Sequence, residues 1–402
     1  MARVSWGKVY KGDDFAGILR EEPGSRYVFT YDENYMNAGG TPIAHTLPLQ
    51  NEPHISHHEI HPFFDNLVAE GWMEQAQTRL LGKRYVSRFE LLLTFGRDCA
   101  GAVHIEDPEP NDLSHVILEA DETIEKAMLV GRASLSGVQP KLGVVLRGNR
   151  FRPAKVNELS THIAKFPSQH HANLVLNEYL TTEAFKCLVP QDEVVEMKME
   201  KLEGFDQDVL LIKRFDRDGQ KRIHFEEMNA LLGYFSHQKY EGAYQDMANF
   251  IYETPDCLPA ENYRLFVRIL AGILLGNTDM HLKNFACFHT ENGLRLTPTY
   301  DQVAAFIYRY KDMALAIGGA KNLKLGELKP KNILTLAKDF RLSDDALMMA
   351  VKQLEKNKEA AMQAIQDASI PASPLKTRLT QDLEKRWKGT FALIGKTLSK
   401  KR

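Results

Sequence analysis

The sequence predicts an α+β protein in which β-rich regions precede a mostly helical region. Strand-like segments broken by Gly and Asp turns dominate residues 1 to about 50, and a second β-rich region extends from about 131 to 225. From about residue 226 onward, apolar residues recur at helical spacing. The chain has 402 residues, which is long enough for two or three domains.

Composition and charge restrict the class of protein. Lys and Arg number 51 and Asp and Glu 53, giving a net charge of −2, which argues against a protein that mainly coats nucleic acid or anionic membrane. No apolar run reaches about 18 residues, and the N-terminus lacks the apolar core of a signal peptide. The four cysteines are widely separated and form no CxxC pair. We therefore expect a cytoplasmic protein with no membrane association.

Patterning divides the chain into three expected parts. Residues 1–125 combine strands such as "GSRYVFTYDENY" with helical stretches such as "SRFELLLTFGRDCAG", and predict an N-terminal α+β subdomain. Residues 126–225 contain a hairpin pattern around Gly148 and Asn149, the strand "THIAKFP" and the helix "ANLVLNEYLTTEAFKCL". Residues 226–402 are mostly helical, apart from the hairpin "FACFHTENGLRLTPTYD". A small β-rich lobe followed by a large helical lobe is the layout of a protein-kinase-like two-lobed fold.

The motif "GNTDMHLKN", residues 276–284, carries the strongest chemical signal. It follows the apolar run "FVRILAGILL", and its Asp279 precedes Asn284 by five positions, as in the catalytic loop of protein kinases. The Asp279 carboxylate would accept the proton of an acceptor hydroxyl, and the Asn284 oxygen would bind Mg²⁺. Lys283 would neutralise charge on the transferring phosphoryl group, and His281 would orient the loop by hydrogen bonds.

Other polar residues follow in the order that a kinase requires. Asp301, after the hairpin, is placed like a second metal ligand, although no Phe-Gly follows it. Lys165 in "THIAKF" would grip the ATP phosphates, with Glu178 of the next helix as its partner and Glu183 as a competitor.

A hinge segment would complete the ATP site. The strand "VLLIKRFDR", residues 209–217, would bond adenine through its backbone, and Asp216 could reach the ribose or the metal. Each of these residues also has a purely structural interpretation. Asp216 could be a turn residue, Lys165 an ordinary strand lysine and Asp301 a helix N-cap. Their order favours the kinase interpretation.

Several of these motifs together resemble those of the HipA-type toxin kinases. They are "SLSGVQPKL", "THIAKFP", "KRFDR", "GNTDMHLKNF" and "LTPTYDQV", with "HPFFDNLVAEGW" in the first part, so that the resemblance extends over roughly residues 1 to 310. It implies an ATP- and Mg²⁺-dependent serine/threonine kinase that acts as a growth-arresting toxin. A helix-turn-helix, HipB-like antitoxin would hold the toxin in check and bind operator DNA, so that DNA is contacted only indirectly. The protein substrate would be an aminoacyl-tRNA synthetase.

The resemblance also assigns roles to residues. It implies Asp279 as the catalytic base, Asn284 and Asp301 as Mg²⁺ ligands, Lys165 as the phosphate-gripping lysine, and Lys213 and Phe215 in the adenine-contacting hinge. A family member has Glu at the position of Lys213. We expect this difference to have little effect on ATP binding, because the hinge contacts adenine through backbone atoms.

The loop "GRASLSGVQPK" corresponds to the family's phosphate-side loop, which carries an autophosphorylated serine. It places Ser136, Gly137 and Val138 beside ATP. Ser134 matches the modified serine, with Ser136 as a rival. A phosphate on either one would add nearly two negative charges and repel ATP.

Two other classes of function stay open on the sequence alone. The chain could be a catalytically weak corepressor or binding partner of the antitoxin. It could also be a small-molecule kinase of related fold, although such a kinase would not require the serine loop or the N-terminal subdomain.

Overall fold

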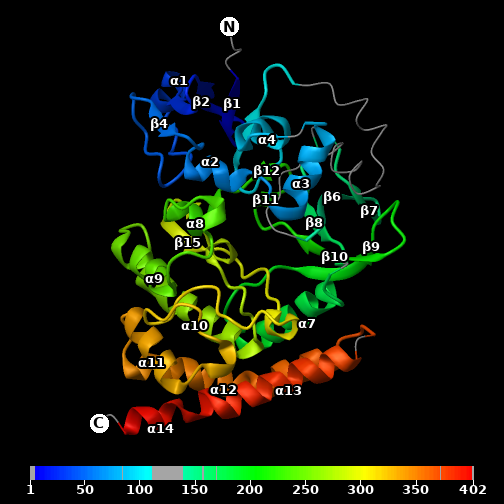
Figure 1. Ribbon diagram of the computed structural model, residues 1–402, viewed down its shortest axis with the longest axis vertical. Coiled ribbons are helices and arrows are strands. Elements are labelled where there is room, and N and C mark those ends of the chain that lie inside the picture. The colour runs from blue at the N-terminus through cyan, green and yellow to red at the C-terminus, as the bar shows by residue number, and fades with distance from the viewer. Residues whose placement is uncertain are drawn as a thin grey trace. The chain divides into compact units, whose positions relative to one another are not determined.

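The computed structural model describes residues 5–83, 85–110, 139–155, 158–168, 170–371 and 373–400. The chain forms two compact units. The first comprises Met1–Phe166 with Met197–Gln238, and the second comprises Pro167–Glu196 with Lys239–Arg402. Figure 1 shows the labelled helices and strands of both units.

An antiparallel sheet opens the first unit. Its five strands lie in the order β4-β3-β2-β1-β5, namely His54–His57, Arg26–Tyr31, Asp14–Glu22, Trp6–Lys11 and Val103–Glu106. In the described part of this region, short helices accompany the sheet: α1 (Glu33–Asn37), α2 (Pro62–Leu67), α3 (Gly71–Leu80) and α4 (Arg88–Phe95). The Ser87 hydroxyl starts α4 by accepting a hydrogen bond from the Glu90 backbone N–H at 3.1 Å. The predicted helix "SRFELLLTFGRDCAG" contains α4, and the strand-like "GSRYVFTYDENY" is β3 as far as Tyr31, whereas its last residues belong to α1.

A second five-stranded antiparallel sheet follows in the same unit. Its order is β7-β6-β8-β10-β9, with bounds Arg150–Pro153, Lys141–Arg147, His162–Lys165, Asp208–Lys213 and Met197–Lys201. The predicted hairpin is confirmed, because β6 and β7 pair on either side of Gly148 and Asn149. Buried side chains of both sheets, including Phe29 of β3, Leu142 of β6 and Val209 of β10, belong to one hydrophobic core.

Short elements complete the first unit. They are β11 (Arg217–Asp218), β12 (Lys221–Arg222), β13 (Phe225–Glu227), α8 (Met228–Leu231) and the 3₁₀ turn η1 (Ser236–Gln238). Asn66, next to the end of α2, is tied to this region by a hydrogen bond from its Nδ2 to the Tyr234 carbonyl at 2.8 Å.

The second unit is mostly helical. It contains the helix that the sequence predicts within residues 126–225, so the bounds of the three expected parts differ from those of the two units. Its helices are α7 (Leu174–Leu188), α9 (Tyr244–Glu253), α10 (Pro259–Leu275), α11 (Pro330–Asp339), α12 (Asp344–Asp367), α13 (Ser373–Gly389) and α14 (Ile394–Ser399). The predicted hairpin consists of β14 (Ala286–Thr290) and β15 (Gly293–Leu296). The described residues of this unit also form the 3₁₀ turns η2 (Leu282–Asn284), η3 (Ala305–Tyr308), η4 (Leu325–Glu327) and η5 (Phe391–Leu393). Figure 1 shows α12 and α13 side by side, and Lys358 of α12 forms an ion pair with Glu384 of α13 at 2.6 Å.

The cysteines and the apolar helices bear on two expectations about the whole chain. All four cysteines are free, as their separation predicts. Among the described residues, no helix has both the length and the apolar character needed to cross a membrane.

Candidate active site

Helix α10 supports the loop that carries the "GNTDMHLKN" motif. Pro259 stands in its first turn, where a fixed φ is favourable, and most of the side chains that follow are buried and apolar. The helix ends at Gly276, whose φ of 89° lies in the left-handed region and whose N–H donates to the Gly272 carbonyl at 2.9 Å. The apolar run therefore becomes a rigid, buried base for the polar loop.

The loop packs closely against the end of this helix. A Cβ atom at Gly272 would lie 2.2 Å from the sulfur of Met280, so only glycine permits this approach. A Cβ atom at Gly276 would lie 2.8 Å from a guanidinium nitrogen of Arg386, which comes from α13. Arg386 also donates from Nε to the Leu274 carbonyl at 2.7 Å, where a cation suits the helix C-terminus.

The Asn277 side chain forms hydrogen bonds that hold the loop. Its Oδ1 accepts a hydrogen bond from the Asp279 backbone N–H at 3.1 Å, and its Nδ2 donates to the Asp301 carbonyl at 3.4 Å. The neighbouring Thr278 hydroxyl donates to the Tyr310 carbonyl at 2.6 Å. These bonds connect the catalytic-type loop to the segment that follows the β14–β15 hairpin.

Asp279 is exposed at the tip of this arrangement. Its Oδ1 accepts a hydrogen bond from the Tyr240 hydroxyl at 2.9 Å. The surrounding protein keeps water away from part of the carboxyl group, which raises the pKa of Asp279 to about 6. The Tyr240 hydrogen bond opposes this shift, the Asp301 charge adds to it, and the Lys239 charge opposes it. A carboxylate with this pKa is ionised near neutral pH and can still accept a proton.

Asn284 and Asp301 lie in direct contact. The Asn284 Nδ2 donates to the Asp301 Oδ2 at 2.9 Å. Asp301 has a φ of 57°, and η3 begins only after Ala304, so the alternative of Asp301 as a helix N-cap is not observed. A carboxylate and an amide oxygen at one place are hard ligands of the kind that Mg²⁺ prefers, so the pair fits that ion.

His281 and Lys283 help to shape the same loop. The His281 backbone N–H donates to the Asn284 Oδ1 at 3.0 Å, and the His281 ring meets the Tyr240 ring edge-on at 5.0 Å. Lys283 is buried, and its carbonyl accepts a hydrogen bond from the Tyr300 hydroxyl at 2.8 Å. The second unit thus brings together all five residues expected around the catalytic loop.

The residues expected around ATP are divided between the units. Lys165 is a buried residue at the end of β8, opposite Lys141 of β6 and Leu210 of β10. Lys213 is exposed at the end of β10, and the half-buried Phe215 packs edge-on against Phe225 at 5.0 Å. All of these belong to the first unit.

Glu178 and the serine loop complete the expected set. Glu178 is fully buried in α7 of the second unit, whereas its competitor Glu183 bonds Lys186 at 2.6 Å. Ser134, Ser136, Gly137 and Val138 lie outside the described residues.

Asp216 has a different environment from the one expected. Its carboxylate accepts hydrogen bonds from Arg214 at 2.7 Å, from Arg217 at 2.8 Å and from the Gly101 backbone N–H at 2.8 Å. Both arginines also pair with Asp98, and all four side chains are buried. Burial by itself would raise the pKa of Asp216, but the two guanidinium groups outweigh it and lower the pKa. This buried ion cluster does not support a contact between Asp216 and ATP, because the carboxylate already has its partners.

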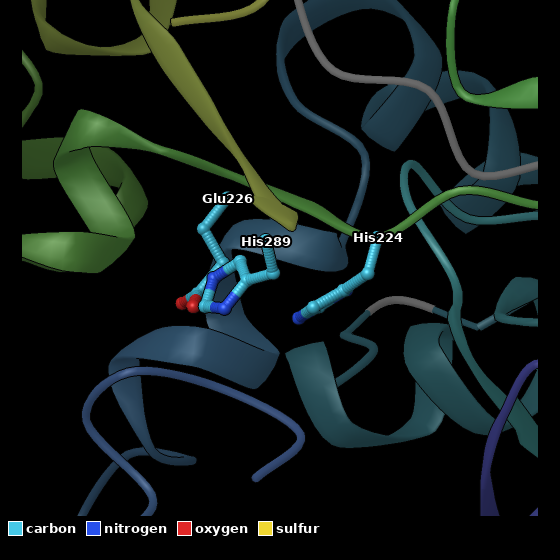
Figure 2. Close-up of side chains that lie close together, drawn as sticks. All are labelled: His224, Glu226 and His289. Carbon is cyan, nitrogen blue, oxygen red and sulfur yellow. The ribbon is translucent and has the colours of Figure 1, made fainter. Parts of the chain in front are cut away.

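Two histidines of the segment before α2 have hydrogen-bond partners within the protein. His54 bonds the Pro48 carbonyl at 2.9 Å, and the Nδ1 of His61 accepts a hydrogen bond from the Phe63 N–H at 3.2 Å as the cap of α2. Figure 2 shows another group of side chains, His224 and Glu226 from the segment around β13 and His289 from β14. His289 belongs to the second unit, and His224 and Glu226 belong to the first.

Two residues that shape the site, Asn277 and Tyr240, were not identified from the sequence. Asn277 lies inside the motif, and an Asn just before a catalytic-type Asp is a recognisable turn former. Tyr240 lies 39 positions before Asp279 and carries no local signal. Only the folded chain brings its hydroxyl to the carboxylate.

Comparison with known proteins identifies the family of the chain. Residues 7–106 match the HipA N-terminal domain, and residues 133–369 match the HipA-like C-terminal domain. The serine/threonine-protein kinase toxin HipA of Shewanella oneidensis is 28% identical over 347 residues, covering 77% of each chain. Y4dM of Sinorhizobium fredii is 27% identical over 323 residues, covering 75% of this chain and 76% of its own. In the solved complex of Shewanella oneidensis MR-1 HipA, HipB and operator DNA, one chain matches with a TM-score of 0.75 at 22% identity, covering 96% of this chain and 99% of that one.

The fold and the site define a protein-kinase-like enzyme. The structural match supports the predicted α+β fold, and the HipA-like C-terminal domain spans more than half of the chain. The chain belongs to the HipA family, and its enzyme class is that of a serine/threonine protein kinase of the toxin type.

Proposed function

We propose that this chain transfers the γ-phosphoryl group of ATP to a serine or threonine of another protein, with Asp279 as the catalytic base. One observation carries the proposal. A carboxylate with a pKa raised to about 6 lies on the same loop as Asn284, which bonds the Asp301 carboxylate at 2.9 Å. A base and a pair of hard oxygen ligands are the parts that phosphoryl transfer requires.

The reaction balances with these residues. The acceptor hydroxyl gives its proton to the Asp279 carboxylate while its oxygen forms a bond to the γ-phosphorus. The bond between the γ-phosphorus and the oxygen bridging to the β-phosphate breaks, and ADP leaves with that electron pair. Lys283, four positions after the base in the chain, would supply positive charge for the phosphoryl oxygens.

Mg²⁺ fits the pair formed by Asn284 and Asp301. When bound there, it would neutralise charge on the ATP phosphates. Asp301 offers a carboxylate oxygen, and the Asn284 Oδ1 has a second lone pair besides the one that accepts from the His281 N–H. The hydrogen bond between the two side chains holds them together before the cation binds.

The remaining ATP contacts are assigned by the motifs. We propose that Lys165, with Glu178, binds the phosphates, that the backbone at Lys213 and Phe215 contacts adenine, and that Ser136, Gly137 and Val138 border the phosphates. Lys165 is buried at the end of the central strand of the second sheet, which agrees with the small-lobe strand lysine that the motif predicts. Asp216 is left out, since its carboxylate is engaged in the ion cluster.

A phosphoryl-transfer assay tests the proposal. The purified chain is incubated with γ-labelled ATP and Mg²⁺, alone and with cell lysate, beside the Asp279→Ala variant. Label on serine or threonine from the native chain, and none from the variant, is expected. Asp312→Asn is the matched control, because Asp312 is an exposed carboxylate elsewhere in the same unit. Equal labelling by Asp279→Ala would rule out Asp279 as the base, and label on a small metabolite instead would indicate a small-molecule kinase.

The cellular role is proposed from the family. The relative from Shewanella oneidensis is named a kinase toxin, and we propose that this chain arrests growth by phosphorylating a translation component, with an aminoacyl-tRNA synthetase as the first candidate. Phosphoproteomics after brief expression, with Asp279→Ala as the reference, identifies the substrate. Growth arrest that persists in that variant would contradict a catalytic mechanism.

We further propose autophosphorylation on the serine loop. Ser134 and Ser136 are the candidates, and a phosphate on either would repel ATP. Mass spectrometry of the chain after incubation with ATP distinguishes them, using Ser134→Ala and Ser136→Ala singly. If neither serine carries a phosphate while protein substrates are labelled, self-inactivation by this route does not occur.

A partner is proposed from the solved complex of the relative, which contains HipA, HipB and operator DNA. We propose that this chain binds a helix-turn-helix antitoxin of the HipB type and reaches DNA only through it. The net charge of −2 agrees with weak DNA affinity of the chain alone. An electrophoretic shift by the chain together with the antitoxin, but not by the chain alone, is the expected result.

A further inference from the structure

Tyr240 makes a specific contact with the proposed catalytic base. Its hydroxyl donates a hydrogen bond to the Asp279 Oδ1 at 2.9 Å. Among the described residues, no other side chain donates to this carboxylate, so Oδ2 is left without a donor. The Asp279 backbone is held separately, because its N–H donates to the Asn277 Oδ1 at 3.1 Å.

The segment that carries Tyr240 is itself held against the catalytic loop. The Leu282 backbone N–H donates to the Lys239 carbonyl at 3.1 Å. The Tyr240 ring lies edge-on to the His281 ring at 5.0 Å, and the Lys239 ammonium stands 5.6 Å from the centre of the Tyr240 ring. Backbone and ring contacts thus aim the Tyr240 hydroxyl at the carboxylate from outside the motif.

Burial does not account for this arrangement. Tyr240 is 51% exposed, so its ring adds little to the hydrophobic core, and its hydroxyl could be satisfied by water. A hydrogen bond to an ionised carboxylate is stronger than one between neutral groups. The contact therefore orients the carboxylate more than it stabilises the fold.

We propose that Tyr240 is a positioning residue for phosphoryl transfer, which holds Oδ1 of Asp279 and leaves Oδ2 to take the proton of the acceptor hydroxyl. This inference rests on the proposed function, because it assigns the two carboxylate oxygens of the base different tasks. Tyr240 does not touch the reacting atoms in this scheme. Its effect passes through the orientation of Asp279.

A second tyrosine provides a matched comparison. Tyr244 stands four positions further on, is fully buried, and its hydroxyl has no hydrogen-bond partner among the described residues. It lies near enough to Asp279 for that charge to raise the pKa of its phenol further, in addition to the larger effect of burial. Tyr244→Phe removes the same atom as Tyr240→Phe in the same neighbourhood, but breaks no hydrogen bond.

The charged and titratable groups near Asp279 determine its pKa, and a pH profile of kcat/KM measures that pKa. Tyr240 and Lys239 lower the pKa of Asp279, the Asp301 carboxylate raises it, and Tyr244 remains a neutral phenol. Removing the Tyr240 hydroxyl should therefore move the acidic limb of kcat/KM to higher pH. A purely structural role would leave this limb in place.

The test compares Tyr240→Phe with the native chain and with Tyr244→Phe. The phenylalanine ring keeps the edge contact with His281, so only the hydrogen bond is removed. We expect kcat for phosphoryl transfer from ATP to fall about tenfold to hundredfold, with unchanged affinity for ATP and only a small decrease in Tm at neutral pH. Tyr244→Phe should keep the native kcat and pH profile. An unchanged kcat and an unmoved acidic limb in Tyr240→Phe would overturn the proposal, as would an equal loss in Tyr244→Phe.

A second measurement separates this inference from the proposed function. The carboxyl group of Asp279 is titrated by NMR in protein with ¹³C-labelled aspartate, and its signal is assigned with Asp279→Asn. The midpoint is expected to rise in Tyr240→Phe but not in Tyr244→Phe, even in a preparation that transfers no phosphate. An unchanged midpoint would show that the hydroxyl does not hold the carboxylate, whereas a shifted midpoint without any kinase activity would contradict the proposed function alone.

Discussion

The Nδ2 of Asn284 donates a hydrogen bond to the Oδ2 of Asp301 at 2.9 Å, so the two expected Mg²⁺ ligands contact each other across the β14–β15 hairpin. Asp301→Asn removes the negative charge that a divalent cation needs, and Asn284→Ala removes the neutral oxygen. We expect either change to lower kcat at least about a hundredfold and to raise the Mg²⁺ concentration for half-maximal rate. Titration of activity with Mg²⁺ measures kcat and the Mg²⁺ concentration for half-maximal rate in each variant, with Asp312→Asn as the control.

The activity should depend on the ionisation of Asp279. Its pKa is raised to about 6, and only the ionised form accepts a proton from the acceptor hydroxyl. As pH rises through about 6, kcat/KM should increase and then level off. A profile between pH 5 and 8 at saturating Mg²⁺ checks this, and a rate that stays flat down to pH 5 would contradict the role of Asp279.

The same carboxylate should lower the stability of the fold at neutral pH. Because the pKa of Asp279 is raised from 3.8 to about 6 on folding, the folded chain holds this proton more tightly than the unfolded chain. The stabilising contribution is full below about pH 4 and is lost as pH rises through about 6. Asp279→Asn should therefore have a higher Tm than the native chain at pH 7.5, with a difference that shrinks toward pH 4. A lower Tm at pH 7.5 would show that the ionised carboxylate stabilises the loop instead.

Gly276→Ala should destabilise the end of α10. The residue has a φ of 89°, and a Cβ atom there would lie 2.8 Å from a guanidinium nitrogen of Arg386. We expect a loss of about 1–3 kcal/mol in the free energy of unfolding, together with lower activity, because the catalytic loop starts at this residue. Chemical denaturation measures the loss. Gly326→Ala is the control, since no atom lies within 4 Å of its added Cβ.

Asp98→Asn should strongly destabilise the first unit. Asp98 pairs with the buried Arg214 and Arg217, and these charges outweigh its own burial and lower the pKa of Asp98 to about 2. Arg222 Nη1 also lies 3.8 Å from Asp98, so removing the charge leaves three arginines with only Asp216, at an expected cost of about 3–5 kcal/mol. The contribution should be present above about pH 4 and fall as pH decreases toward 2. Asp13→Asn, at an exposed position, should leave the denaturation midpoint unchanged, and an equally small effect of Asp98→Asn would show that the cluster adds no net stability.

Much of the second unit could be predicted from local pattern. The apolar run before "GNTDMHLKN" is α10, the hairpin after it is β14 with β15, and Asp279, Asn284 and Asp301 lie in the order that the spacing predicts. These features depend on neighbours in the sequence, since helical periodicity, turn residues and a five-residue spacing are all local. The α+β class and the kinase motifs follow from the same information.

Asp216 shows where local pattern fails. The letters "KRFDR" are equally compatible with a carboxylate that faces a ligand and with one that faces its own arginines. The decision depends on Asp98 and Gly101, which lie more than a hundred positions earlier and are brought to the cluster by the fold of the first unit. A charged side chain takes whichever partner the tertiary structure places beside it, because a buried charge must be compensated.

The sequence by itself determined the class of fold, the order of the motifs and the residue types that phosphoryl transfer needs. The tertiary structure alone decided that Tyr240 holds one oxygen of Asp279, that Asn284 bonds Asp301 and that Asp216 belongs to an ion cluster. The physical reason is that hydrogen bonds act over about 3 Å, a distance at which separation along the chain is irrelevant. Periodicity and spacing report the neighbours of a residue along the chain, whereas its partners across the chain are set by packing.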